Sequence, residues 1–212
     1  MQLSLLKPTI MKKYITEFIG TFFLVLTIAL SGEPLAIGAA LMVMVFAGGH
    51  VSGAHYNPAV TLAILLRGRI TLNEALVYMV SQVIGAVAAA LIAGWFMGFP
   101  ETAVLELDAR IIKALGAEIL GTFALAYVVL NVATAKGTMG NHFYGLAIGF
   151  TVFAMATGLG KISGGAFNPA VAVGLSVLKI FAWKNIWIYL VGCFGGTVLA
   201  ALIFRMINPE DK

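Results

Sequence analysis

Two Asn-Pro-Ala triplets, at 57–59 and 168–170, combine residue types that could do hydrogen-bond chemistry in an otherwise apolar chain. An Asn side chain both donates and accepts hydrogen bonds, and Asn followed by Pro suits the first turn of a helix. The apolar stretches that begin there, 58–66 and 169–178, are short. Nine helical residues cover roughly 13 Å, about half of a hydrocarbon core. We therefore expect two half-helices that begin at mid-membrane.

The two triplets belong to a longer repeat. The segments 49–60 and 160–171 share seven of twelve residues at an offset of 111. Farther upstream, the Glu-x-x-Gly-Thr-Phe sequences at 17–22 and 118–123 match at an offset of 101. Each half holds three long apolar segments, an odd number, so the second half must enter the membrane upside down. We expect inverted repeats at 12–97 and 111–207 within one transmembrane channel domain, 1–212.

The composition requires a bilayer around much of the chain. Of the 212 residues, 61% are apolar and 10% are charged, whereas soluble domains are nearer half apolar and a quarter charged. Spans of roughly 20 residues are needed to cross a bilayer, and six apolar segments qualify, at about 14–30, 35–49, 72–97, 111–135, 143–159 and 186–207. The fold class is an all-α membrane protein with six transmembrane helices and two half-helix re-entrant loops. Glu17 and the repeat favour a retained first span over a cleaved signal peptide.

Charge and cysteine usage exclude several classes of function. The 13 basic residues form no run that could follow a phosphate backbone, so no nucleic-acid partner is expected. Eight of them fall on one side of the predicted spans and five on the other, which favours cytoplasmic N- and C-termini. The short loops favour a prokaryotic plasma (inner) membrane.

No metal-ligand spacing or nucleophile–base pair is present, so neither an enzyme nor a cofactor is predicted. Cys193, the single cysteine, excludes an intrachain disulfide.

Inverted halves would bring the two half-helices tip to tip, with Asn57 and Asn168 facing one point. Irregular backbone cannot face lipid, so the stretches 50–56 and 161–167 should line a wet cavity or be buried in protein. Their carbonyl groups could accept hydrogen bonds from a solute, and the asparagines could donate them. Each helix N-terminus carries about half a positive charge, which disfavours cations. These features predict a passive pore for small uncharged solutes.

Both triplets stand in a Ser-Gly-x-x-x-Asn-Pro-Ala frame, at 52–59 and 163–170, and each follows a Glu-x-x-Gly-Thr span. On these motifs the chain resembles the major intrinsic protein family, the aquaporins and glycerol facilitators, over nearly its whole length. The resemblance implies one pore per protomer in a homotetramer. It also implies that Glu17 and Glu118 support the re-entrant loops through hydrogen bonds, as does His50, for which pore lining is the alternative. The pore motifs would comprise Asn57, Pro58, Ala59, Asn168, Pro169 and Ala170.

The sequence departs from this family at the expected selectivity filter. Most members have Arg after the second Asn-Pro-Ala, where this chain has Val171. Counting from the motifs assigns the filter positions to Ile37, Ala156, Gly165 and Val171. This set has neither the aromatic–His–Arg pattern of water filters nor the Arg–aromatic pattern of glycerol filters, so the pore should be wide and apolar. The alternative is that Lys161, Phe167 or Phe153 fills the constriction.

Alternative functions remain open at this point. The expected solutes are water and small neutral molecules such as glycerol-like polyols, urea, ammonia, peroxide or neutral metalloid hydroxides. A strictly water-selective aquaporin is the nearest alternative. A coupled secondary transporter also fits inverted repeats and broken helices, but only Glu17 and Glu118 could titrate near the midplane. An intramembrane enzyme lacks a catalytic group set, and a structural junction protein would show no permeability in vesicles.

Overall fold

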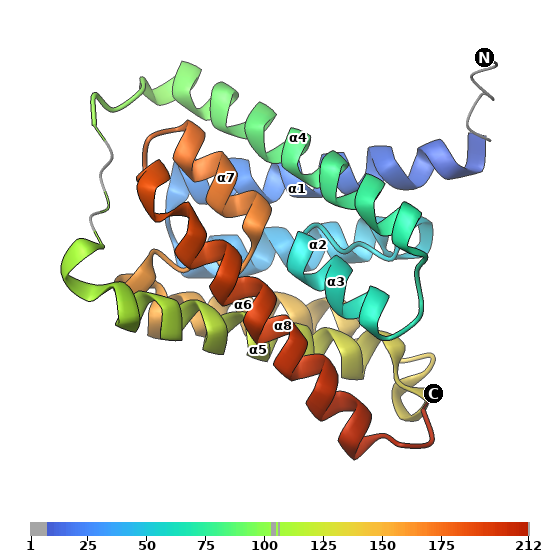
Figure 1. Cartoon of the computed structure of the whole chain (residues 1–212). Coiled ribbons are helices and arrows are strands. Elements are labelled where there is room, and N and C mark those ends of the chain that lie inside the picture. The colour runs from blue at the N-terminus through green and yellow to red at the C-terminus, as the bar shows by residue number, and fades with distance from the viewer. Residues whose placement is uncertain (1–7, 103–104, 106, 212) are drawn as a thin grey trace, which may run out of the picture.

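The computed structural model describes residues 8–102, 105 and 107–211, with side chains from residue 11 onward. Six of the helices in this part of the chain are long and apolar enough to cross a membrane. They are α1 (Pro8–Ser31), α2 (Pro34–Ser52), α4 (Leu72–Met97), α5 (Ile111–Thr134), α6 (Tyr144–Ser163) and α8 (Ile186–Ile207). Two nine-residue helices, α3 (Pro58–Leu66) and α7 (Pro169–Val177), are too short to cross (Figure 1). Short 3-10 turns complete the structure at η1 (Asp108–Arg110), η2 (Lys136–Thr138) and η3 (Trp183–Asn185).

The irregular stretches before the two short helices are shorter than the sequence predicts. Helix α2 continues to Ser52 and α6 to Ser163, so only 53–56 and 164–167 are non-helical before the asparagines. Gly53 and Gly164 end these helices with φ of 87° and 96°, a left-handed conformation that glycine adopts without steric cost. The predicted limits at 50 and 161 were wrong because the helices continue through the earlier glycines and end only where Gly53 and Gly164 adopt the left-handed conformation.

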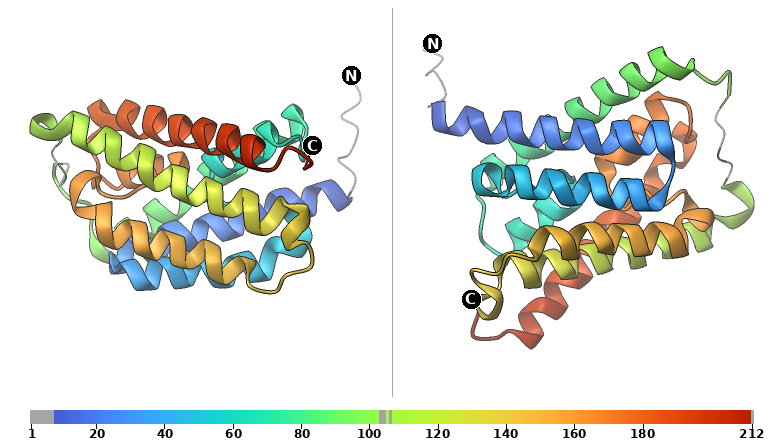
Figure 2. Two further views of the ribbon diagram at one scale, coloured as in Figure 1. Left: turned by 90° about the horizontal axis from the view of Figure 1, so that it is seen from below. Right: turned by 180° about the vertical axis from the view of Figure 1, so that it is seen from behind.

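Close contact between long helices depends on small residues. A Cβ on Gly85 of α4 would lie 2.5 Å from the Phe18 carbonyl oxygen of α1, and one on Gly196 of α8 would lie 2.4 Å from the Ile119 carbonyl oxygen of α5. Helices approach this closely in membranes where small residues leave room for the neighbouring backbone. Further views show α8 along α5 and α1 along α2 (Figure 2).

The two halves of the chain meet where α2 crosses α6. A Cβ on Gly38 would come 2.6 Å from the Gly149 carbonyl oxygen, and a Cβ on Gly149 would come 2.4 Å from the Gly38 carbonyl oxygen. Ile37, the residue before Gly38, is buried.

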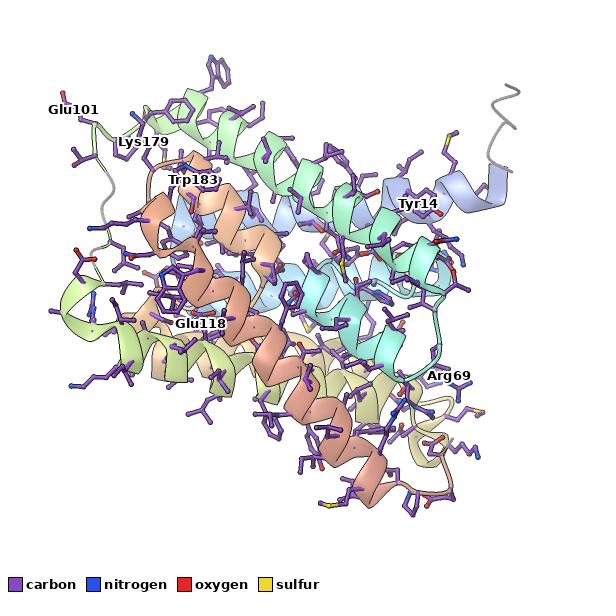
Figure 3. The ribbon with its side chains drawn as sticks, viewed as in Figure 1. Tyr14, Arg69, Glu101, Glu118, Lys179 and Trp183 are labelled. Atoms are coloured by element: carbon purple, nitrogen blue, oxygen red, sulfur yellow. The ribbon has the colours of Figure 1, made fainter. Side chains whose placement is uncertain are left out.

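The surface is apolar and several interior residues are polar, the reverse of a soluble protein. Trp95 and Ile112 are 75% and 85% exposed, whereas Glu17 and Glu118 are 0% exposed. Such a surface suits lipid as the surrounding solvent. The protein is therefore a multi-pass membrane protein. Of the residues labelled in Figure 3, Arg69 lies toward one end of the bundle and Glu101, Lys179 and Trp183 lie toward the other, whereas Glu118 is buried between them.

One end of the bundle contains the start of α1 and the end of α8 (right in Figure 1), and we call it the terminal side. Helix α3 ends toward the terminal side, and α7 ends toward the opposite side. Both short helices begin in the interior.

Candidate functional site

The two short helices begin at a shared point, where their asparagines form reciprocal hydrogen bonds. Asn57 Nδ2 donates to the Phe167 carbonyl oxygen at 2.9 Å, and Asn168 Nδ2 donates to the Tyr56 carbonyl oxygen at 2.9 Å. Both asparagines are buried. The structure thus brings together two residues that lie 111 positions apart in the chain.

Each asparagine also caps its own helix. Asn57 Oδ1 accepts a hydrogen bond from the Ala59 N–H at 2.8 Å, and Asn168 Oδ1 accepts one from the Ala170 N–H at 2.9 Å. An Asn amide carries two N–H donors, so one on each side chain is left to serve a solute after the cross-bond is made. The capped ends concentrate two positive helix termini at one point, which opposes the entry of a cation.

Glu17 supports the loop before α3. Its Oε1 accepts hydrogen bonds from Ser52 Oγ at 2.6 Å and the His55 N–H at 3.0 Å, and its Oε2 accepts from the Tyr56 N–H at 2.7 Å and Gln82 Nε2 at 2.8 Å. The carboxylate thereby satisfies two backbone donors that cannot bond within a helix. Such buried backbone groups must find partners, so Glu17 determines the path of the loop.

Glu118 makes the corresponding bonds to the loop before α7. Its Oε1 accepts from Ser163 Oγ at 2.6 Å and the Ala166 N–H at 3.1 Å, and its Oε2 accepts from the Phe167 N–H at 2.7 Å. The fourth partner is the Cys193 thiol, 3.6 Å from Oε2. A thiol is a weak donor, so this carboxylate is held less strongly than Glu17.

Sequence reasoning assigned no role to three polar residues that complete the first loop. Gln82 Nε2 donates to Thr61 Oγ1 at 3.0 Å as well as to Glu17, and His55 Nδ1 lies 3.1 Å from the same Thr61 oxygen. At the offset of 111 their counterparts are Cys193, Ala172 and Ala166. A polar residue within an apolar span is a functional candidate. The position of Gln82 within such a span could therefore have indicated its role from the sequence.

The aromatic rings of Tyr56 and Phe167, which precede the two asparagines, pack against glycines. Tyr56 and Phe167 have φ of 51° and 48°, which is unusual for residues with a side chain. A Cβ on Gly20 would come 2.1 Å from the Tyr56 ring, and one on Gly121 would come 2.2 Å from the Phe167 ring. The rings therefore pack against α1 and α5, and the carbonyl groups of the same residues bond the opposite asparagines.

We predict that Gly121→Ala displaces the Phe167 ring and weakens the crossing. Overpacking in a close-packed site typically costs about 1–3 kcal/mol, and the Phe167 carbonyl that Asn57 uses should shift with the ring. Gly116→Ala on the same helix is the control, because a Cβ there meets no heavy atom within 4 Å. Thermal unfolding in detergent and solute flux in vesicles should both fall for the first variant alone. Equal unfolding temperatures and equal solute flux in the two variants would show that Gly121 is not needed to position the Phe167 ring.

A narrow cavity of about 30 Å³ surrounds the crossing. One wall consists of residues 54–57 and 165–168 of the two loops. The rest of the lining is aliphatic and comprises Leu24, Ile28, Ile37, Leu41, Val60, Leu125, Val129, Ile148, Val152 and Val171. No Lys, Arg, Asp or Glu lines this cavity in the described part of the chain. A volume of this size has room for about two water molecules.

Three of the four predicted filter residues, Ile37, Gly165 and Val171, line the narrow cavity. Ala156 is not part of that lining, whereas Val152, one turn earlier on α6, is. Val171 is buried within the first turn of α7. Phe167 also lines the cavity, although its ring packs against Gly121.

A vestibule of about 610 Å³ opens on the terminal side and shares the lining residues Ala54, His55, Val129 and Ile148 with the narrow cavity. His50 is exposed on the vestibule wall, outside the hydrogen-bond network of Glu17. His55 is buried and contributes to the lining of both spaces. Over residues 8–102, 105 and 107–211, no group of three or more His, Cys, Asp or Glu side chains is placed to hold a metal ion.

Comparison with known proteins identifies the family. The family model described as "Major intrinsic protein" matches residues 4–204. The chain belongs to the major intrinsic protein family. "Aquaporin NIP1-3" of Oryza sativa subsp. japonica is 36% identical over 95% of this chain and 75% of that protein. "Glycerol uptake facilitator protein-like 6" of Lactiplantibacillus plantarum is 35% identical over 95% of this chain and 100% of that protein.

Solved structures support the same fold. The X-ray structure of the aquaglyceroporin from Plasmodium falciparum matches with a TM-score of 0.72 at 20% identity, over 95% of this chain and 98% of that one. Members of the major intrinsic protein family are channels and not enzymes. This member is a passive membrane channel for water and small solutes, and its two crossed half-helices belong to an aquaporin-like fold.

Proposed function

We propose that this channel is a broad-selectivity pore that passes water and small uncharged solutes larger than water. The observation that supports this most strongly is the aliphatic, uncharged remainder of the cavity lining, which includes Val171 in the first turn of α7. In this proposal Ile37, Ala156, Gly165 and Val171 form the filter. An apolar filter offers a solute no side-chain hydrogen bond, so size and the loop carbonyls decide what passes.

The two walls act on different parts of the solute. Carbonyl groups of the loops accept hydrogen bonds from hydroxyl or amine groups, and Asn57 and Asn168 donate hydrogen bonds where the half-helices meet. Carbon-bearing faces of the solute contact the aliphatic wall at little cost. An ion would lose its hydration without full replacement, and a cation would also meet two positive helix termini.

The solutes that fit this chemistry are glycerol-like polyols, urea, ammonia, peroxide and neutral metalloid hydroxides. We further propose a homotetramer in the plasma membrane with both termini in the cytoplasm, so that the vestibule faces the cytoplasm. Inverted repeats at 12–97 and 111–207 are supported by the nearly equal backbone angles of Asn57 (φ −159°, ψ 121°) and Asn168 (φ −159°, ψ 115°).

Stopped-flow light scattering on proteoliposomes tests the proposed function. Water, glycerol and urea should each cross faster than in protein-free vesicles, linearly with the solute gradient and independently of any proton or sodium gradient. Flux of water alone would identify a strictly water-selective pore, an alternative favoured by the small volume of the narrow cavity, about 30 Å³. Flux that depends on a proton or sodium gradient would identify a coupled transporter.

A further inference from the structure

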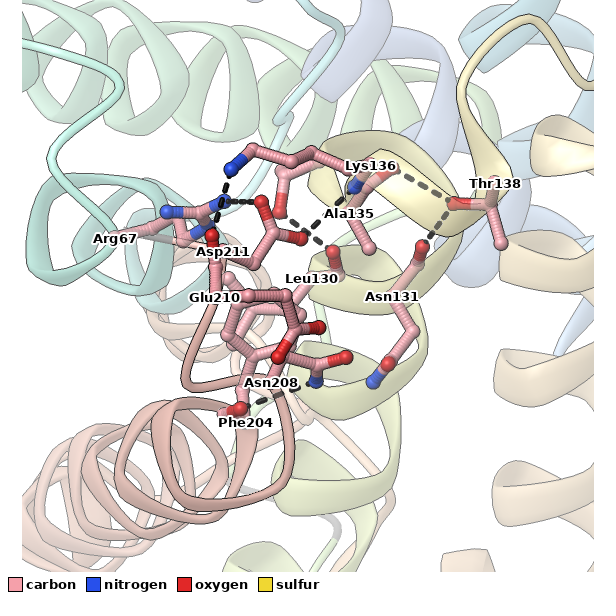
Figure 4. Close-up of polar contacts among 11 residues, drawn as sticks. Arg67, Leu130, Asn131, Ala135, Lys136, Thr138, Phe204, Asn208, Glu210 and Asp211 are labelled. Atoms are coloured by element: carbon pink, nitrogen blue, oxygen red, sulfur yellow. Dashed lines mark hydrogen bonds and ion pairs between the residues drawn. The ribbon is translucent and has the colours of Figure 1, made fainter.

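A carboxylate that follows α8 is buried against the terminal end of the bundle. Asp211 Oδ1 accepts a hydrogen bond from Arg67 Nη2 at 2.6 Å, and Oδ2 accepts one from the Lys136 backbone N–H at 2.8 Å (Figure 4). The side chains of Arg67 and Asp211 are 4% and 2% exposed. Buried charges of this kind require close partners, and both oxygens of Asp211 have one.

Neighbouring contacts fold the segment 208–211 back onto the bundle. Lys136 Nζ donates to the Glu210 carbonyl oxygen at 2.6 Å, and Asn208 Nδ2 donates to the Phe204 carbonyl oxygen at 3.1 Å. The Arg67 guanidinium also lies over the Phe204 ring, 5.1 Å from its centroid. The position of Asp211 is thus determined by several contacts and not by a single ion pair.

The two partners of Asp211 lie beside two parts of the vestibule lining, although neither belongs to that lining itself. Arg67 is the C-cap residue directly after α3, and the nearby residues Ile64 and Arg69 line the vestibule. Lys136 begins the connection between α5 and α6, whose residues 138–141 form another part of the wall. Asp211 itself is not among the vestibule residues. It lies outside the vestibule lining, where it joins the residue that follows α3 to the start of the α5–α6 connection.

Apart from the two bonds of Lys136 to Glu210 and Asp211, side chains of the α5–α6 connection donate hydrogen bonds to the preceding helix, α5. Thr138 Oγ1 donates to the Asn131 carbonyl oxygen, and Asn141 Nδ2 donates to the Val132 carbonyl oxygen at 2.7 Å. These bonds shape the connection without joining it to α3. Asp211 supplies that joint, across 75 residues to Lys136 and 144 residues to Arg67.

We propose that Asp211 is a positioning residue for the channel mouth, and that by joining Arg67 to Lys136 it keeps the α5–α6 connection clear of the vestibule. With the joint intact, a vestibule of about 610 Å³ adds little resistance to that of the narrow cavity. Without it, the connection is free to enter the vestibule and obstruct solutes. The transport effect rests on the proposed function, whereas the positioning effect does not.

The charges around Asp211 predict how the joint responds to pH. Burial raises the pKa of Asp211, but the Lys136 N–H and the charges of Arg67 and Lys136 outweigh burial and hold the pKa below its ordinary value. A carboxylate of lowered pKa contributes stability above its unfolded-state pKa and loses it as pH falls through the folded-state value. The joint therefore persists at neutral and mildly acidic pH and opens only in stronger acid. The charged residues on the elements packed around it are Arg67, Lys136, Arg205 and Glu210.

Asp211→Asn tests the proposal against Glu210→Gln, which makes the same charge change at an adjacent exposed side chain. Glycerol flux through Asp211→Asn should fall about threefold or more, the effect of a mouth closed in about two-thirds of the molecules. Water flux should fall less, and backbone hydrogen exchange at 135–143 should rise. Asp211→Glu should recover part of the flux, and Glu210→Gln should match the wild type.

Two further measurements separate positioning from general stability. Wild-type flux should drop toward that of Asp211→Asn only in strong acid, while the variant shows no such step. Lys136→Pro removes both the N–H that bonds Asp211 and the Nζ that bonds Glu210, at a 3-10 helix start where proline is tolerated. It should reproduce the loss if Asp211→Asn folds poorly. Unchanged exchange at 135–143, or faster exchange with unchanged glycerol flux, overturns the proposal. If the wild type conducts nothing, the proposed function fails, and the exchange measurement alone decides whether Asp211 positions the connection.

Discussion

Glu17→Ala should abolish most of the solute flux and lower the unfolding temperature, because four buried donors lose their acceptor at once. Each buried donor left unpaired costs roughly 1–3 kcal/mol. Four such losses would remove a large part of a typical stability of about 5–15 kcal/mol. Freed backbone N–H groups at His55 and Tyr56 would let the loop move, and the Tyr56 carbonyl that Asn168 uses would move with it. Thermal unfolding in detergent and stopped-flow flux per folded protein measure the two effects.

The matched control is Glu33→Ala, which removes an exposed carboxylate that makes no side-chain cap bond. It should leave stability and flux unchanged. Glu118→Ala should be damaging but milder than Glu17→Ala, because one of its four partners is the weakly bonding Cys193 thiol instead of an amide. Wild-type flux per folded molecule in Glu17→Ala would show that the carboxylate does not position the first loop.

Val171→Arg should cut glycerol and urea flux by about tenfold, since an added barrier of about 1.4 kcal/mol is sufficient for that factor. The longer side chain would enter a cavity of only about 30 Å³, and its guanidinium would compete with solutes for the loop carbonyls. Water flux should fall less because water is smaller. A fixed charge about 4 Å from a cation opposes it by about 4 kcal/mol at an effective dielectric constant of 20. Any residual cation leak should therefore also decrease.

Val171→Met separates size from charge, because methionine is long but uncharged. It should reduce glycerol and urea flux without suppressing cation leak to the same extent. The measurements are solute flux by light scattering and cation flux with an entrapped fluorescent indicator, on the same vesicle preparations. Unaltered passage of glycerol and urea through Val171→Arg would show that Val171 does not belong to the constriction.

Much of the architecture could be read from local sequence. Apolar segments of sufficient length predicted the six spans, and the limits of α3, α4 and α8 were predicted to the residue. Asn-Pro marks the start of both short helices because proline suits the first turn and asparagine caps it. The membrane character and the channel class followed from composition and from paired motifs, which are encoded within a few dozen residues.

Other features depend on contacts between distant parts of the chain. His55, Thr61 and Gln82 form one network only because α4 packs against the first loop, and no periodicity in the sequence indicates that contact. The rings of Tyr56 and Phe167 pack against glycines of other helices, which only the packed helices reveal.

By itself, the sequence determined the spans and the two half-helix starts, because hydrophobic length and capping chemistry act locally. The supporting role of Glu17 and Glu118 was predicted from the family resemblance alone. Tertiary structure alone decided that His50 faces the vestibule, that Val152 rather than Ala156 reaches the narrow cavity, and that Asp211 joins Arg67 to Lys136. The physical reason is that a side chain's partners depend on how helices rotate and cross. That arrangement is determined by the packing of the whole bundle and not by any single segment.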